Sequence, residues 1–139
     1  MSHVNQQLPT YATGGCLCGA VRYTIHGPLR GVVNCHCEQC RRTHGHFAAY
    51  SAARCADLRL LESRGLKWYM PADGYARRGF CGECGASLFW EPLGQDQISI
   101  AAGTLDQPTG LHTTHHIFVR DAGDYYELND DLEKLEAGM

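Results

Sequence analysis

The sequence predicts a mainly β domain made of small antiparallel sheets. Segment 20–26 alternates the apolar residues Val21, Tyr23 and Ile25 with polar ones, which is the period-two pattern of a half-buried strand. Later segments of similar length are rich in aromatic and β-branched residues and are separated by turns of Gly, Pro or Asp. Helical patterns are few and short. Together these observations favour sheets over helices as the framework of the fold.

Taken in chain order, the predicted strands cover much of the chain after residue 20. Beyond segment 20–26 they are 30–34, 47–52, 66–70, 76–80, 86–90, 97–102 and 114–119. One helical turn is expected at 38–43, and a second, frayed turn is expected at 130–136. Four aromatic side chains are expected in the core, namely Trp68, Phe89, Trp90 and Phe118.

Length and composition limit the domain organisation and the partners. With 139 residues, 44% of them hydrophobic, the chain suits one domain over residues 1–139, of which segment 1–12 is expected to be loose. No apolar run approaches the roughly 18 residues of a membrane span, so we expect a soluble protein with no membrane partner. The net charge of −3 argues against a nucleic-acid partner, because proteins of that class carry a basic excess.

Eight cysteines are unusual in a chain of this length, and seven of them fall in short clusters. The clusters are Cys16 and Cys18, then Cys35, Cys37 and Cys40, then Cys81 and Cys84. Cys55 stands alone and is expected to be a small buried apolar side chain. The N-terminus has no basic segment followed by an apolar stretch, so no secretory signal is predicted. We therefore expect a cytoplasmic protein with reduced thiols.

The spacing within the clusters favours a metal over disulfides. Cysteines one or two residues apart meet the geometry of a disulfide poorly. Two sulfurs on one tight turn, by contrast, can occupy neighbouring corners of a zinc tetrahedron. Glycines beside the clusters, among them Gly82 and Gly85, allow the turns to tighten around the sulfurs. We therefore expect sheets that are pinned by zinc.

Seven clustered cysteines cannot complete two sites of four sulfurs each. A site with four sulfurs is closed and structural, whereas a site with three protein ligands keeps a position for water or substrate. The pair at 16 and 18 could join the cluster at 35–40, or it could join the pair at 81 and 84 across the fold. We favour the second pairing because a CxCxxC run can supply three ligands by itself, although the spacing permits both.

Several motifs, in this order along the chain, resemble those of one family. They are GGCLCGAVRY at 14–23, CHCEQCRR at 35–42, RGFCGECG at 78–85 and GTLD at 103–106, with HIF at 116–118 and DYY at 124–126. The set closely resembles the glutathione-dependent formaldehyde-activating enzyme (Gfa) family, whose relatives include centromere protein V. The resemblance extends from about residue 13 to residue 128.

This resemblance implies a fold of the β-tent (Mss-like) type with two zinc ions per chain. It implies that a structural zinc is held by Cys16, Cys18, Cys81 and Cys84. It also implies that a catalytic zinc is held by Cys35, Cys37 and Cys40, which would be the catalytic residues.

The activity that the resemblance implies is that of a carbon–sulfur lyase. Such an enzyme adds the thiol of glutathione to formaldehyde, or a related thiol to a small aldehyde, and the reaction is reversible. Three thiolates leave a zinc site formally anionic, which favours activation of a substrate thiol over polarisation of a carbonyl. The alternative function is a non-catalytic zinc-binding module that binds a partner. The oligomeric state is left open.

Polar residues near the second cluster are weaker candidates. His36 could form a hydrogen bond to sulfur or move a proton, and an exposed linker histidine is an equal expectation. His44 and His46 could complete the coordination or act as a general acid, but solvated surface histidines are the commoner case. Arg41 and Arg42 could bind a substrate carboxylate, with a solvated charged turn slightly favoured for at least one of them.

Two further sets of polar residues are candidates with ordinary alternatives. Asp106 could orient a substrate amine, but Asp is also common in turns. A third metal site could be suggested for His112, His115 and His116, but a polar edge strand is the stronger expectation.

Overall fold

The computed structural model describes residues 9–138, which form two β-sheets with one α-helix. The smaller sheet has the strand order β1-β2-β5, with bounds β1 (Ala12–Gly15), β2 (Arg22–Ile25) and β5 (Leu58–Glu62). The larger sheet has the order β11-β10-β3-β4-β9-β8-β7-β6. Its bounds are β11 (Glu133–Lys134), β10 (Thr113–Ile117), β3 (Val32–Cys35), β4 (Ala48–Arg54), β9 (Gln97–Ala101), β8 (Ser87–Pro92), β7 (Ala76–Cys81) and β6 (Leu66–Tyr69).

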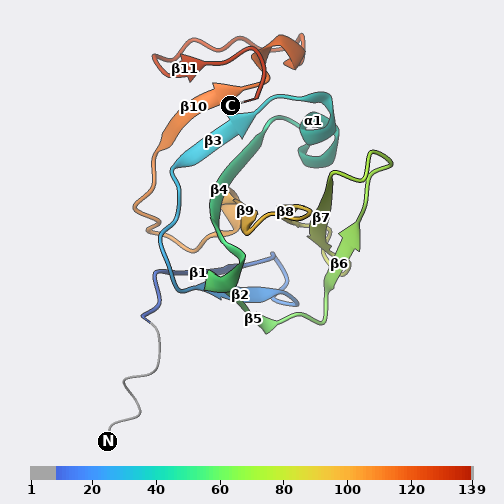
Figure 1. The fold of residues 1–139 in the computed structure, drawn as a ribbon, viewed down its shortest axis with the longest axis vertical. Coiled ribbons are helices and arrows are strands. Elements are labelled where there is room, and N and C mark those ends of the chain that lie inside the picture. Colours follow the sequence, from blue (N-terminus) through green and yellow to red (C-terminus); the bar gives the residue numbers. More distant parts are fainter. Residues whose placement is uncertain (1–8, 139) are drawn as a thin grey trace, which may run out of the picture.

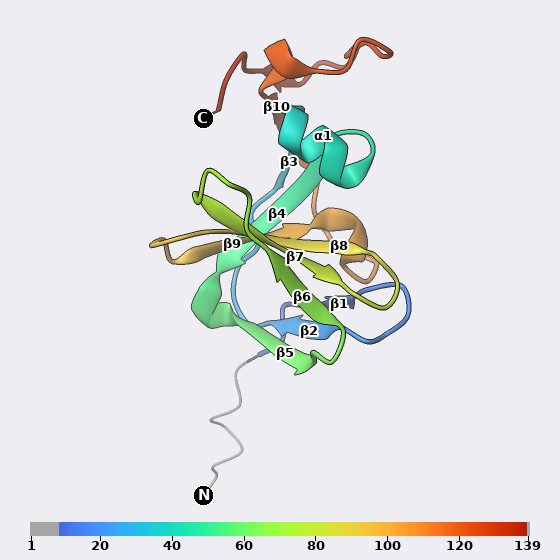
Figure 2. The same cartoon turned by 90° about the vertical axis from the view of Figure 1, so that its right-hand side faces the viewer.

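Helices are short and connect strands. The α-helix α1 (Glu38–His44) lies between β3 and β4. Three 3-10 turns follow, η2 (Cys55–Asp57), η3 (Ala102–Thr104) and η4 (Val119–Asp121). Figures 1 and 2 place the three-stranded sheet at one end of the molecule, and α1, β10 and β11 at the other. In the part of the chain that the structure describes, no helix is long and apolar enough to cross a membrane.

The mainly β prediction is confirmed. The smaller sheet is antiparallel throughout, and so are the pairs that join β3, β4, β9, β8, β7 and β6. The larger sheet is mixed, however, because β10 runs parallel to both β3 and β11. The likeness to the β-tent type stays a prediction.

The eight predicted strand segments all contain a strand, and the helical turn at 38–43 is α1. Three strands were not predicted, namely β1, β5 and β11. The helical turn expected at 130–136 is wrong, because 133–134 pair with β10 instead. That short pairing adds a strand to an existing sheet, an interaction that local sequence does not encode.

The N-terminal segment is described only in part. Residues 1–8 of the segment expected to be loose lie outside the described residues. The backbone N–H of Tyr11 donates to the carbonyl oxygen of Ile25 at 2.7 Å, and β1 begins at Ala12.

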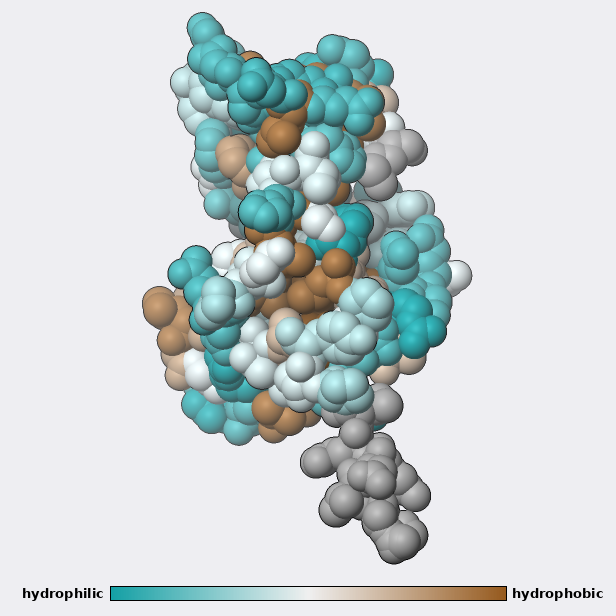
Figure 3. All heavy atoms as spheres, turned by 90° about the vertical axis from the view of Figure 1, so that its left-hand side faces the viewer, coloured by the Kyte–Doolittle hydropathy of each residue, from teal (hydrophilic) through white to brown (hydrophobic). Residues whose placement is uncertain are grey.

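Two apolar clusters form the core. The larger one joins the two sheets, and its large, fully buried side chains include Val21, Tyr23, Ile25, Leu88, Phe89 and Ile100. The ring of Tyr23 meets Phe89 edge to face with 5.4 Å between centroids, a favourable aromatic arrangement. The smaller cluster lies under α1 and includes Cys35, Cys40 and Tyr50. On the face drawn in Figure 3, apolar surface is recessed at mid-height between more hydrophilic surface above and below.

Candidate metal centres and active site

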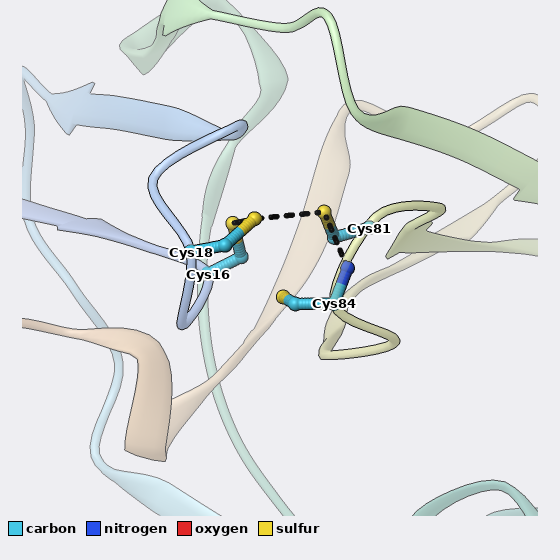
Figure 4. Close-up of side chains that lie close together, drawn as sticks. All are labelled: Cys16, Cys18, Cys81 and Cys84. Atoms are coloured by element: carbon cyan, nitrogen blue, oxygen red, sulfur yellow. Dashed lines mark hydrogen bonds between the residues drawn. The ribbon is translucent and has the colours of Figure 1, made fainter.

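Four cysteines from distant parts of the sequence meet at one end of β7. Cys16 and Cys18 lie in the turn between β1 and β2, whereas Cys81 ends β7 and Cys84 follows it (Figure 4). Their sulfur atoms all lie within 4.8 Å of one another. The Sγ atoms of Cys16 and Cys18 are 3.8 Å apart, as are those of Cys18 and Cys81. In tetrahedral coordination with Zn–S bonds of about 2.3 Å, the sulfurs lie about 3.8 Å apart. The four-sulfur cluster therefore fits a zinc ion whose four ligand positions are all filled by cysteine.

The backbone around the four-sulfur cluster directs N–H groups at sulfur. The Sγ of Cys81 accepts from the N–H groups of Glu83 and Cys84, both at 3.4 Å, and the Sγ of Cys16 accepts from Val21 at 3.3 Å. Such donors stabilise negatively charged sulfur. The turn after Cys81 closes at Gly85, whose φ of +81° favours glycine.

Gly65 allows a second segment to approach the four-sulfur cluster. A Cβ atom at this position would lie 2.8 Å from the Sγ of Cys81 and 2.7 Å from the Cβ of Ala20. The backbone of Gly65 also bonds to both sides of the cluster, since its N–H donates to Ala20 and its carbonyl oxygen accepts from Gly82. Only a residue without a side chain can therefore connect the two cysteine turns at this distance.

The remaining three clustered cysteines come from one continuous stretch. Cys35 ends β3, Cys37 is the N-cap of α1, and Cys40 lies in the first turn of the helix. The Sγ of Cys37 accepts from the N–H of Cys40 at 3.3 Å, as a capping side chain does. The three Sγ atoms lie within 4.8 Å of one another. The CxCxxC spacing thus places one sulfur at the end of β3 and two at the start of α1, close enough to form a three-sulfur cluster.

The three-sulfur cluster suits a cation with one further ligand position. Among residues 9–138, no fourth Cys, His, Asp or Glu joins this group. Without a cation, the three thiols cannot all lose their protons together. The hydrogen bond between Cys35 and Cys37 is the largest cause in both cases: it raises the pKa of Cys35 and lowers the pKa of Cys37. A cation among the three sulfurs would stabilise all of them as thiolates, and three thiolates are a donor set typical of zinc. The pairing of the first and third clusters is the one favoured from the sequence.

Arg78 places a positive charge against the three-sulfur cluster. It lies on β7, is only 5% exposed, and its Nη2 is 3.6 Å from the Sγ of Cys40. Nη2 also donates to the Oε1 of Gln39 at 2.9 Å, and Nη1 donates to the Tyr50 hydroxyl at 3.3 Å. Arg78 begins the motif at 78–85, but neither Arg78 nor Tyr50 was among the candidate site residues predicted from the sequence. A charged residue on the inward-facing side of the predicted strand 76–80 was the available signal for Arg78.

A cavity of about 740 Å³ opens beside the three-sulfur cluster. All three cysteines line it, together with side chains of the larger sheet such as Val33, Tyr50, Trp90 and Ser99. Strand register places Trp90 opposite both Ser99 and Arg78, so these residues form one row across β9, β8 and β7. The cavity therefore lies over the sheet face to which the three sulfurs belong.

The aromatic residues expected in the core divide into two groups. Phe89 is buried, and Trp68 packs against it with 6.1 Å between ring centroids. Trp90 and Phe118 are half-buried and line the cavity. Phe118 has a φ of 56°, a left-handed backbone that costs a non-glycine residue on the order of 1 kcal/mol. Trp90 and Phe118 pack against the smaller core cluster, as the core expectation has it, and they also border the cavity.

The histidines near the three-sulfur cluster lie in three separate hydrogen-bonded sets, of which the first joins His36 and His116. His36 is fully buried, which rules out the exposed-linker alternative, and its Nδ1 and Nε2 bond to the Tyr126 hydroxyl and to His116. His116 is also buried and bonds to Asp130 at 2.8 Å. The expected polar edge strand is thus wrong for His116, because β11 covers β10 on the outer side.

The other two histidines bond to tyrosines rather than to the cluster. His44 lies 2.9 Å from the Tyr50 hydroxyl, and burial first, with Arg78 second, lowers its pKa to about 4. His46 is exposed and bonds to the hydroxyl of Tyr125 at 2.7 Å. Neither histidine belongs to the three-sulfur group, so the solvated alternative fits His46 whereas His44 is half-buried.

The candidate charged residues lie outside the cavity. Arg42 is exposed and pairs with Glu38, and Arg41 lies on α1 without lining the cavity. Asp106 accepts from Thr13 at 2.6 Å and from Arg22 at 2.7 Å near β1 and β2, in keeping with a turn residue.

Two remaining candidates also lie apart from the sites. His112 is exposed, and within residues 9–138 it forms no group with His115 and His116 that could hold a metal ion. Cys55 is half-buried, with its sulfur 3.6 Å from a carboxylate oxygen of Glu91.

The chain is similar in sequence to one protein family and in fold to a solved structure. A family model described as glutathione-dependent formaldehyde-activating enzyme matches residues 11–121, well over half of the chain. The crystal structure of a Rhodobacter sphaeroides protein, a structural genomics target, is 25% identical and superposes with a TM-score of 0.60. The match covers 73% of this chain and 97% of that chain. Both cysteine clusters lie within the range that the family model matches.

Proposed function

Since the chain belongs to the glutathione-dependent formaldehyde-activating enzyme family, we propose that it is a zinc-dependent carbon–sulfur lyase. Its reaction is the reversible addition of a thiol such as glutathione to formaldehyde or a related small aldehyde. Two zinc ions per chain serve this function. The ion at Cys16, Cys18, Cys81 and Cys84 is structural, whereas the ion at the three-sulfur cluster of Cys35, Cys37 and Cys40 is catalytic.

One observation carries this proposal: the two clusters differ in how many sulfurs they offer. The four-sulfur cluster has all the ligands that a tetrahedral ion takes. The three-sulfur cluster is one ligand short and opens into the 740 Å³ cavity. A structural ion needs no such opening, whereas a catalytic ion needs a free position and room for a substrate beside it.

The reaction requires a thiolate and a carbonyl carbon held close together. A bound zinc ion supplies positive charge that lowers the pKa of a neighbouring thiol. The thiolate sulfur attacks the carbonyl carbon, the C=O π electrons move to oxygen, and that oxygen takes up one proton. The thiol and aldehyde together contain every atom of the product, so no oxidant or reductant takes part.

The protein's own residues hold the charge and exclude water. Arg78 lies against Cys40 and offsets part of the negative charge of three thiolates. The Tyr50 hydroxyl fixes the Arg78 guanidinium from the other side. Trp90 and Phe118 supply apolar walls to the cavity, which keeps competing water away from the reacting carbon.

The test is metal analysis combined with NMR exchange spectroscopy of glutathione and formaldehyde. We expect two zinc ions per chain and exchange faster than in buffer. The Cys37→Ala variant should keep one zinc ion, keep its fold and lose the acceleration. Cys55→Ala is the matched control, because Cys55 lies outside both clusters, and it should keep both zinc ions and the acceleration.

Three results would contradict the proposal. One is full acceleration by Cys37→Ala with the second zinc absent. Another is the absence of acceleration by wild-type protein with both ions bound, which would favour the zinc-binding interaction module. A third is acceleration that is unchanged after both ions are removed.

Two further expectations belong to this proposal. Residues 1–139 act as a single zinc-binding catalytic domain, since both clusters draw on residues between 16 and 84 and the cavity draws on residues up to 138. A cytoplasmic location also stays a prediction, and it agrees with the need for reduced thiols.

A further inference from the structure

Arg30 is a half-buried guanidinium on the wall of the cavity. Its Nη2 donates to the carbonyl oxygen of Tyr50 at 2.9 Å, and its Nε donates to the carbonyl oxygen of Gly31 at 3.2 Å. Burial alone lowers the pKa of this side chain, and no carboxylate acts in the other direction. Its charge therefore costs the folded protein desolvation without compensation from an ion pair.

The lack of a carboxylate sets Arg30 apart from most arginines of the chain. In the described residues, ion pairs with carboxylates are formed by Arg22, Arg42, Arg54, Arg64, Arg77 and Arg120. No such pair is found there for Arg30 or Arg78, and these two are the arginines that line the cavity. Arg41 and Arg59 also lack such a pair in the described residues, but neither lines the cavity, so Arg30 and Arg78 are the two unpaired guanidiniums at this site.

In the described part of the chain, no acidic residue of the cavity wall forms an ion pair with the Arg30 guanidinium. Asp73 is the one carboxylate among the lining residues, and it is exposed. Its Oδ1 accepts the backbone N–H of Tyr75 at 3.0 Å. Arg78 is engaged by the thiol of Cys40 and by the side chains of Gln39 and Tyr50. Arg30 donates only to backbone carbonyl oxygens, through Nε and Nη2, so its charge is the one that a ligand carboxylate can meet.

Strand geometry places Arg30 within one small molecule's length of the three-sulfur cluster. The Arg30 guanidinium is bonded at the backbone of Tyr50, and Tyr50 lies opposite Val33 in the sheet. Val33 and Cys35 are two residues apart on β3 and line the same cavity. At about 3.3 Å per residue, this corresponds to roughly 7 Å along the strand.

We infer that Arg30 binds a carboxylate of the substrate thiol, while the sulfur of the same molecule lies at the three-sulfur cluster. This inference rests on the proposed function and narrows its substrate class to anionic thiols whose carboxylate lies several bonds from the sulfur. Arg30 then discriminates between thiols by charge. Guanidinium and carboxylate groups form charge-assisted hydrogen bonds, which are stronger than those between neutral groups.

The first test is a binding measurement by calorimetry or NMR on the zinc-loaded protein. The probes are S-methylglutathione, which has no free thiol, and its diethyl ester, which lacks the carboxylates. We expect wild type to bind the acid about tenfold more tightly than the ester, since one charge-assisted hydrogen bond is being lost. Equal binding of the two probes by wild type, or no binding of either, would overturn the inference.

The second test removes the charge from the protein. Arg30→Gln should bind acid and ester alike, whereas Arg30→Lys should retain part of the preference for the acid. Arg59→Gln is the matched control, because Arg59 is exposed on β5 and does not line the cavity. A tenfold preference that survives in Arg30→Gln would overturn the inference. Thermal melts show whether each variant folds, and the wild-type ester comparison tests the inference without any variant.

The inference and the proposed function can fail separately. Exchange spectroscopy with 2-mercaptoethanol, a neutral thiol, reports the chemistry without a carboxylate. Accelerated exchange without any preference for the acid would leave the lyase function in place and remove the role of Arg30. A preference for the acid that depends on Arg30, without acceleration of any thiol, would support the anion site and contradict the lyase function.

Discussion

His36 and His116 are both buried, and their rings share a hydrogen bond of 2.9 Å between Nε2 and Nδ1. The chain of bonds continues from His116 Nε2 to Asp130 and from His36 Nδ1 to the Tyr126 hydroxyl. When a neutral His116 donates a hydrogen bond from Nε2–H to the Asp130 carboxylate, its Nδ1 accepts from the Nε2–H of His36, and the Nδ1 of His36 then accepts from the Tyr126 hydroxyl. The bonds therefore orient the backbone between Cys35 and Cys37 from the C-terminal part of the chain.

Replacement of His116 by Leu should weaken both the fold and the three-sulfur cluster. The change leaves the buried Nε2 of His36 without a partner, which costs about 1–3 kcal/mol of the free energy of unfolding. Denaturant unfolding measures this loss, and competition with a chelator measures zinc retention, which should fall at the three-sulfur cluster only. His112→Leu is the control, because His112 is exposed. Stability equal to wild type in His116→Leu would contradict the assigned bonds.

The charge of Arg78 should help to retain zinc at the three-sulfur cluster. Arg78→Gln removes the cation that lies 3.6 Å from Cys40, so the mutual repulsion of three thiolates is no longer offset. We expect several-fold faster zinc loss to a chelator and slower thiol exchange. Arg77→Gln is the matched control, because Arg77 is the next residue on β7 but pairs with Glu91 and stacks on Trp68. Equal zinc loss from the two variants would be evidence against this role.

Gly65→Ala should disturb the four-sulfur cluster. The added methyl group would lie 2.8 Å from the Sγ of Cys81, and overpacking of this kind costs about 1–3 kcal/mol. We expect a lower melting temperature and weaker zinc binding at the four-sulfur cluster, both followed by chelator titration with calorimetry. Gly103→Ala is the control, since a Cβ atom there meets nothing within 4 Å. The prediction fails if both alanine variants have the same melting temperature as wild type.

His44 should make the fold less stable below neutral pH. Its pKa is about 4 in the folded protein, against an ordinary value of 6.5, because burial disfavours the charged ring. The unfolded chain therefore binds more protons between pH 6.5 and 4, so stability falls as pH falls through that window. His44→Gln should reduce the loss of unfolding free energy between pH 7.5 and 5 by about 1 kcal/mol, a figure lowered for the partial exposure of the ring.

The comparison for His44 is a difference between two pH profiles. Zinc release at low pH affects wild type and His44→Gln alike, so it cancels in the difference. His46→Gln is the control, because His46 is exposed. Parallel profiles for wild type and His44→Gln would show that His44 does not titrate with folding.

Local pattern was sufficient for most strands and for the helix. Alternation of apolar and polar residues marked β2, and the helical turn expected at 38–43 is α1, whose N-cap Cys37 the structure shows. The missed strands lack this signal. β1 contains two adjacent glycines, β5 has a largely exposed surface, and β11 is two residues long. Their pairing depends on a neighbouring strand that is distant in sequence.

The sequence by itself determined which cysteines could act together, because ligands on one turn are fixed by spacing alone. It also determined the mainly β class, which follows from the two-residue period of the strands. Only the tertiary structure decided that Cys16 and Cys18 meet Cys81 and Cys84, since β7 must fold back beside the first turn. It alone revealed the cavity with Arg30 and Arg78 on its wall, and the full burial of His36. These features arise from contacts between residues far apart in the chain, and no local pattern encodes the distance between them.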